Sequence, residues 1–147
     1  MLSLYERWNE LDPSKKEFTA LYKEVRDKVR AAHGGLQEKH QIEHLKSAAL
    51  DTLTAIQALD SVRFREIMSL LNFFEMLGTY TKNNYLPIRD VIQLYKGPIL
   101  EAEIVCTAFI AQWQKDAHMP PGLFQHALYL MKRTKRREEC PYLRWIL

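Results

Sequence analysis

Two histidines one helical turn apart have the spacing that most directly suggests chemistry. His40 and His44 flank Glu43 in the pattern HxxEH, in which two imidazoles on one helix face hold a zinc ion and the carboxylate acts on a zinc-bound water. Such a site needs a third protein ligand, which the sequence does not identify. We therefore expect a polar helix face with no bound metal, and a small metal-dependent hydrolase is the last of three functional alternatives.

A second candidate is the basic run over residues 132–137, because clustered cations can contact phosphates. Tyr129, Tyr142 and Trp145 flank it with rings that can stack on bases. The isoelectric point of about 8.8 is low for a dedicated nucleic-acid binder, and the helix dipole favours cations at any helix C-terminus. A solvated helix end, a nucleic-acid site and a contact with an acidic protein surface stay open for its basic residues, which are Lys132, Arg133, Lys135, Arg136 and Arg137.

The third candidate is a set of polar residues on the most apolar helix, predicted over 62–80. On a helical wheel its apolar side chains fill an arc of roughly 200°, twice that of an ordinary surface helix, so it should lie at the centre of the fold. Arg63 and Glu66 fall inside this arc, Glu75 borders it and Asn72 lies on the remaining face. Arg63 and Glu66 form ion pairs that set the register of the helix, with each other or with other partners, or they sit at the end of the bundle where water reaches them. The alternative is a polar pocket, lined by all four residues, that binds a ligand.

The elements that position these residues are all helical. Apolar residues recur at intervals of three or four throughout, no segment alternates with period two, and no hairpin turn is present. Ser3 with Glu6 and Ser14 with Glu17 have capping-box spacing. We expect one all-α domain over residues 1–147, an irregular bundle of about six helices. The expected breaks lie after residue 11 and at Gly34-Gly35, Asp60-Ser61, Asn83-Asn84, Gly97-Pro98 and Pro120-Pro121-Gly122.

Composition limits the class of protein further. The 147 residues are 47% hydrophobic and 27% charged, which is typical of a folded domain. The net charge of +3 is uneven, since residues 1–131 sum to −1 and residues 132–147 to +4. No apolar run approaches the roughly 20 residues that span a bilayer, and the N-terminus lacks a secretory signal pattern. We expect a cytoplasmic protein in which Cys106 and Cys140 are free thiols.

Part of the sequence resembles a family of uncharacterised, mostly bacterial helical domains of unknown function. The resemblance covers roughly residues 61–147 and depends on Arg63, on Leu71-Asn72-Phe73-Phe74-Glu75 and on Pro141-Tyr142-Leu143-Arg144-Trp145. It implies a helical fold and brings no established activity or catalytic residue. Members of the family often carry an N-terminal membrane segment, which this sequence lacks. The resemblance also marks Arg63, Asn72 and Glu75 as a site to follow in the structure.

No nucleophile motif and no glycine-rich phosphate loop is present, so we expect a protein that is not an enzyme and needs no cofactor. Its abundant aromatic and methionine side chains are of the kinds enriched in interface cores. The leading hypothesis is a non-catalytic module, a regulator or inhibitor from a bacterium or a mobile element, that binds an unidentified protein or a second copy of itself. A nucleic-acid binder that uses the basic run is the first alternative.

Overall fold

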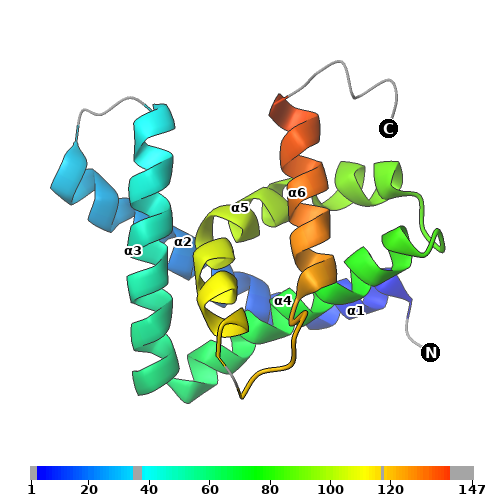
Figure 1. Ribbon diagram of the computed structural model, residues 1–147, viewed down its shortest axis with the longest axis horizontal. Coiled ribbons are helices and arrows are strands. Elements are labelled where there is room, and N and C mark those ends of the chain that lie inside the picture. The colour runs from blue at the N-terminus through cyan, green and yellow to red at the C-terminus, as the bar shows by residue number, and fades with distance from the viewer. Residues whose placement is uncertain (1–2, 35–37, 117, 140–147) are drawn as a thin grey trace.

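The computed structural model describes residues 3–34, 38–116 and 118–139, with the backbone alone at residues 38–40. Every regular element in these ranges is an α-helix, which confirms the all-α class (Figure 1). Cys140, Tyr142 and Trp145 lie outside the described residues. The six helices are α1 (Leu4–Glu10), α2 (Asp12–His33), α3 (Glu38–Leu59), α4 (Ser61–Lys82), α5 (Ile88–Gln114) and α6 (Gln125–Glu139).

The prediction that the helix over 62–80 lies at the centre is confirmed. This helix, α4, contacts α2, α3, α5 and α6. Figure 1 shows α3 and α6 as two upright helices, with α5 between them and α4 along the base. Helices α2, α3, α4, α5 and α6 all contribute to one hydrophobic core, which includes the buried side chains of Phe18, Leu53, Phe74, Ile99 and Leu130.

The first helix docks through one aromatic side chain. Ser3 and Glu6 form the predicted capping box at the start of α1. The Trp8 ring lies with its centroid 5.3 Å from that of Phe73 and 5.0 Å from that of Tyr95. Since α1 has no fully buried residue, these ring contacts account for much of its attachment to the fold.

The predicted start of the second helix is wrong. Helix α2 begins at Asp12, with Pro13 in its first turn, and no side chain caps it. Proline is tolerated there because the first amides of a helix have no intrahelical acceptor. Ser14 and Glu17, predicted as a capping box, instead bond to α4: the Ser14 hydroxyl donates to Glu66 at 2.8 Å, and Glu17 accepts from Arg63 at 3.0 Å.

The predicted break at Gly97-Pro98 is also wrong, because α5 runs through both residues. Pro98 removes a single N–H from the helix, and Gly97 has no Cβ to meet the proline ring. Figure 1 shows that α5 is bent, as expected of a helix with an internal proline. The buried residues on the two sides of Pro98 continue one apolar stripe, which holds the helix together, and they are Val91, Ile92, Tyr95, Ile99 and Ala102.

The contact between α4 and α6 requires a glycine. A Cβ built on Gly78 would lie 2.1 Å from the carbonyl oxygen of His126, at the start of α6. No side chain fits in that space, so the backbones of the two helices touch at this point.

We predict that Gly78→Ala destabilises the fold by at least about 2 kcal/mol, because the new methyl group forces α6 away from α4. Gly97→Ala is the control, since its Cβ would meet nothing within 4 Å apart from its own neighbours in the chain. Its effect should stay within about 1 kcal/mol, because the gain in helix propensity is offset by contact with the proline ring. Urea denaturation of both variants measures the difference, and equal losses of stability would contradict the assignment.

Candidate functional site

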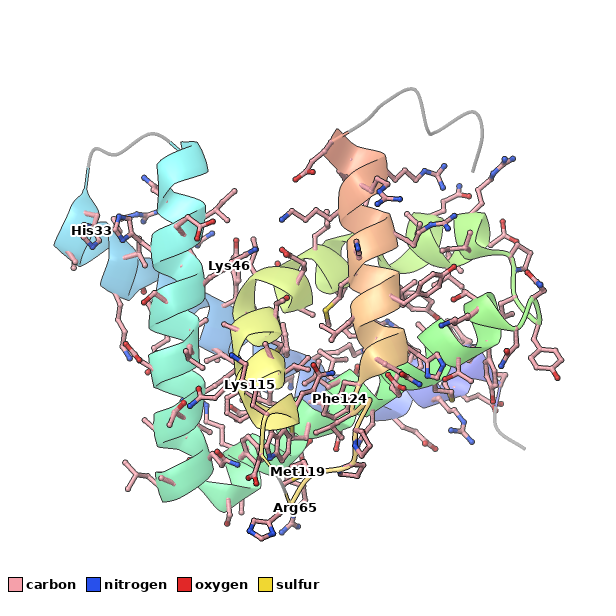
Figure 2. All side chains as sticks on the ribbon, in the orientation of Figure 1. His33, Lys46, Arg65, Lys115, Met119 and Phe124 are labelled. Carbon is pink, nitrogen blue, oxygen red and sulfur yellow. The ribbon has the colours of Figure 1, made fainter. Side chains whose placement is uncertain are left out.

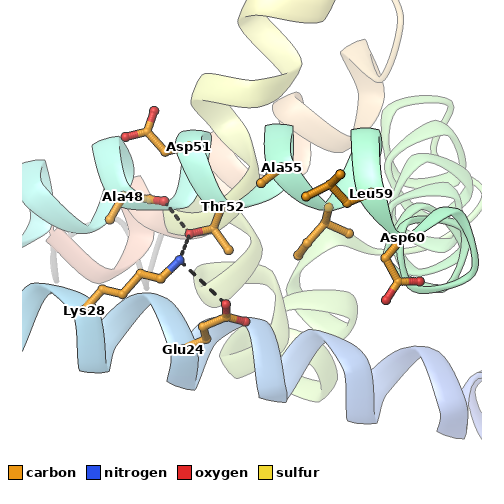
Figure 3. Close-up of a pocket in the computed structure, with 9 residues that line it drawn as sticks. Glu24, Lys28, Ala48, Asp51, Thr52, Ala55, Leu59 and Asp60 are labelled. Atoms are coloured by element: carbon orange, nitrogen blue, oxygen red, sulfur yellow. Dashed lines mark hydrogen bonds and ion pairs between the residues drawn. The ribbon is translucent and has the colours of Figure 1, made fainter.

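A groove lies between α2 and α3 (Figure 3). Its central cavity has a volume of about 420 Å³. A second hollow of about 270 Å³ continues it toward the ends of the two helices and shares Lys28, Ala48 and Asp51 with it. The central cavity is lined by apolar side chains from α3 and by charged ones from both sides, namely Glu24, Lys28, Ala48, Asp51, Thr52, Ala55, Ile56, Leu59 and Asp60.

The polar groups of the groove are held in place by contacts between the two helices. The Lys28 ammonium donates to the Thr52 hydroxyl at 3.0 Å and lies 3.6 Å from the Glu24 carboxylate (Figure 3). The Thr52 hydroxyl in turn donates to the Ala48 carbonyl at 2.8 Å. Glu24 also accepts from Arg63 at 3.0 Å, so α4 anchors this side of the groove.

Two large apolar side chains are exposed near the end of α3, and one of them, Leu59, lines the central cavity. Leu59 is 87% exposed and Val62 is 65% exposed, at the corner between α3 and α4. By spacing alone both residues should face the core, because Leu59 is the last residue of an apolar stripe along α3 and Val62 belongs to the apolar arc of α4. This corner lies beyond the edge of the core, and no other described helix covers it. The apolar periodicity of a single helix does not show where such a covering helix is missing.

The other end of the groove holds part of the HxxEH motif. The His44 ring stacks on that of His33, with centroids 3.8 Å apart and an interplanar angle of 16° (Figure 2 labels His33). Stacked rings do not converge their nitrogen lone pairs on one point, as a shared metal would require. Glu43 is exposed, and the His40 side chain lies outside the described residues. Among the described side chains, no cluster of three or more His, Cys, Asp or Glu is arranged to hold a metal ion.

The structure separates the four residues proposed as a polar pocket. Arg63 bonds to Glu17 and Glu24 of α2, and Glu66 accepts from Ser14 at the start of α2. Asn72 is exposed. Glu75 points to α6 instead, so the four side chains contact different neighbours and do not converge.

Glu75 caps the N-terminus of α6 from a different helix. Its carboxylate accepts from the backbone N–H of Ala127 at 2.7 Å and of His126 at 3.4 Å, and lies 2.8 Å from His126 Nδ1. Phe124, just before α6, has a positive φ of 57° and a side chain that cannot accept a hydrogen bond (Figure 2). A carboxylate at a helix N-terminus also interacts favourably with the helix dipole.

We predict that Glu75→Ala destabilises the protein by about 2 kcal/mol, because it leaves the first amides of α6 without their acceptor. Asn72→Ala, on the exposed side of the same helix, should change stability by no more than about 0.5 kcal/mol. Chemical denaturation of both variants checks this. A loss of similar size in the two variants would contradict the capping role of Glu75.

The basic run on α6 divides into two groups. Lys135 lies 3.4 Å from the buried carboxylate of Glu103 on α5, which also accepts from Lys46 of α3 at 3.1 Å (Figure 2 labels Lys46). Lys135 is therefore part of a contact that joins α3, α5 and α6. The remaining four residues lie away from this ion pair, and they are Lys132, Arg133, Arg136 and Arg137.

The Lys135 ion pair predicts how stability depends on pH. Burial lowers the pKa of Lys135, but Glu103 and Glu139 raise it by more, so that it lies above the ordinary value of 10.5. A pKa that is higher in the folded state gives a stabilisation that is complete below the unfolded value and is lost as the pH rises through the folded value.

Lys135→Met should therefore lower the melting temperature near pH 7, and the difference from the unmodified protein should shrink as the pH rises beyond the ordinary lysine value of 10.5. Lys132→Met, an exposed change on the same helix, should show no such pH-dependent difference. Thermal melts at both pH values measure this, and a Lys135→Met difference that persists at high pH would show that the ion pair is not its source.

The remaining chemical candidate is Cys106, which is buried on α5 as a free thiol. Burial raises its pKa far above the ordinary value, so the reactive thiolate is suppressed.

The described part of the chain includes no helix with both the length and the apolar character to cross a bilayer.

Comparisons of this chain with family models, with curated proteins and with solved structures find no match. The resemblance to a family of helical domains of unknown function therefore stays a prediction from the sequence.

Proposed function

We propose that the protein is a non-catalytic interaction module, a regulator or inhibitor in the cytoplasm, that binds a protein partner through the groove between α2 and α3. The observation that carries the proposal is the exposure of Leu59, which lines the 420 Å³ cavity, together with that of Val62, three positions further along the chain. Single exposed apolar residues are ordinary, but two large ones close together in the chain, one of which lines a cavity, are typical of a binding surface.

The groove also has a charge preference. Three carboxylates, Glu24, Asp51 and Asp60, line the central cavity with one ammonium, that of Lys28. Lys28 already bonds within the groove, to Thr52. A complementary partner is therefore a protein segment that places an apolar side chain against Leu59 and a cationic side chain near Asp51.

Affinity capture tests the proposal. The immobilised protein and three variants are incubated with a lysate of the organism that encodes it. Leu59→Asp removes the apolar contact, and Ala55→Trp fills the groove. Leu94→Asp is the matched control, because Leu94 is 73% exposed on α5. All three sites are exposed, so each variant should fold normally.

We expect a partner that is retained by the unmodified protein and by Leu94→Asp. Leu59→Asp should weaken its binding by about 30-fold, the effect of losing a side chain worth about 2 kcal/mol at an interface. Sedimentation of the purified protein tests the second copy as partner, because a dimer through the groove would dissociate in the Leu59→Asp variant. Equal retention by all variants would rule out the groove as the binding surface.

A further inference from the structure

A cationic surface forms where α6 meets the end of α4. The Lys82 ammonium lies 5.7 Å from the centroid of the Tyr129 ring, and the Arg133 guanidinium lies 5.8 Å from the same centroid. The ring thus contacts cations from two different helices. We call this surface the α6 basic face, and its residues are Lys82, Lys132, Arg133, Arg136 and Arg137.

Two guanidinium groups of the α6 basic face have hydrogen-bonding capacity that the fold does not use. Arg133 Nε and Arg137 Nη1 are buried and have no hydrogen-bond partner within the described part of the chain. Buried donors without acceptors are rare, and each one calls for an explanation. A phosphate bound to these guanidinium groups would supply acceptors once the covered N–H groups turned to face it, because guanidinium forks match the oxygens of a phosphate.

The two acidic residues next to this surface, Glu138 and Glu139, form ion pairs with lysines that do not belong to the α6 basic face. Glu138 forms an ion pair with Lys96 of α5, and Glu139 lies 4.0 Å from Lys135. Lys132, Arg136 and Lys82 are exposed to solvent. The positive charge that the sequence concentrates near its C-terminus is therefore displayed on one side of α6, together with a lysine from α4.

We propose that the α6 basic face binds the phosphate backbone of a nucleic-acid duplex without regard to base sequence. Figure 1 shows that the C-terminal half of α6 extends beyond α5, so a regular backbone can approach it. Lys82 and Arg133 lie over the Tyr129 ring, so the ring is not available to stack on unpaired bases. This favours contact with the phosphates of a duplex over the binding of a single strand.

Fluorescence anisotropy with a labelled duplex of about 20 base pairs, titrated at about 50 to 200 mM salt, tests the proposal. Five phosphate contacts predict a slope of about −4.5 for the logarithm of the association constant against the logarithm of salt concentration. Arg133→Gln with Arg137→Gln should weaken binding and reduce the magnitude of this slope by about 1.8.

A double variant on α2, Lys23→Gln with Arg30→Gln, is the control, because it makes the same change in net charge at two exposed positions. It should keep the slope of the unmodified protein. Melting temperatures establish that both double variants are folded. Lys82→Gln with Lys132→Gln changes two exposed members of the α6 basic face and provides a second test if the arginine variant unfolds.

Four outcomes would overturn the proposal. They are no binding at about 50 mM salt, equal weakening by the α2 control, tighter binding of a single strand than of the duplex, and binding of vesicles containing phosphatidylserine in preference to the duplex.

Discussion

The contact between α4 and the start of α6 is the constraint on which the rest of the structure depends. Gly78 lets the two backbones touch, and one turn earlier Glu75 accepts hydrogen bonds from the first amides of α6. Because the N-terminus of α6 is held at this point, the helix buries Ala127, Leu130 and Met131 in the core. The same placement brings Tyr129 over to Lys82, which creates the α6 basic face.

Charged side chains that look anomalous on an apolar helix serve as connections between helices. Arg63 joins α4 to two glutamates of α2, and Glu103 joins α5 to lysines of α3 and α6. These ion pairs are partly buried, and a partly buried charge that loses its partner is costly, so such pairs disfavour other arrangements of the same helices. The two proposed binding surfaces are the groove between α2 and α3, one side of which Arg63 anchors through Glu24, and the outer side of α6.

Much of the fold could be predicted from the sequence, because apolar periodicity reports which side of each helix is buried. The stripe Phe18, Leu21 and Val25 is buried as expected, and so is most of the arc of α4. The failures have local causes. Gly97-Pro98 is a strong break signal, yet the apolar stripe of α5 continues across it and tertiary packing outweighs the lost hydrogen bond. Leu59 shares the spacing of a core residue but lies beyond the reach of any covering helix.

The candidate sites could be predicted only in part. The sequence locates a basic run, but cannot show that Lys135 turns to Glu103 or that Lys82, 47 positions before Tyr129, joins the others. It locates His44, but not its stacking on His33.

The sequence by itself determined the helices, their buried sides and the position of the positive charge, because backbone hydrogen bonds and side-chain neighbours in a helix connect residues three or four apart. Only the tertiary structure decided which charges meet. The partners of Arg63 and Glu75 lie 39 to 52 positions away, and their meeting depends on how helices cross, which no local pattern specifies.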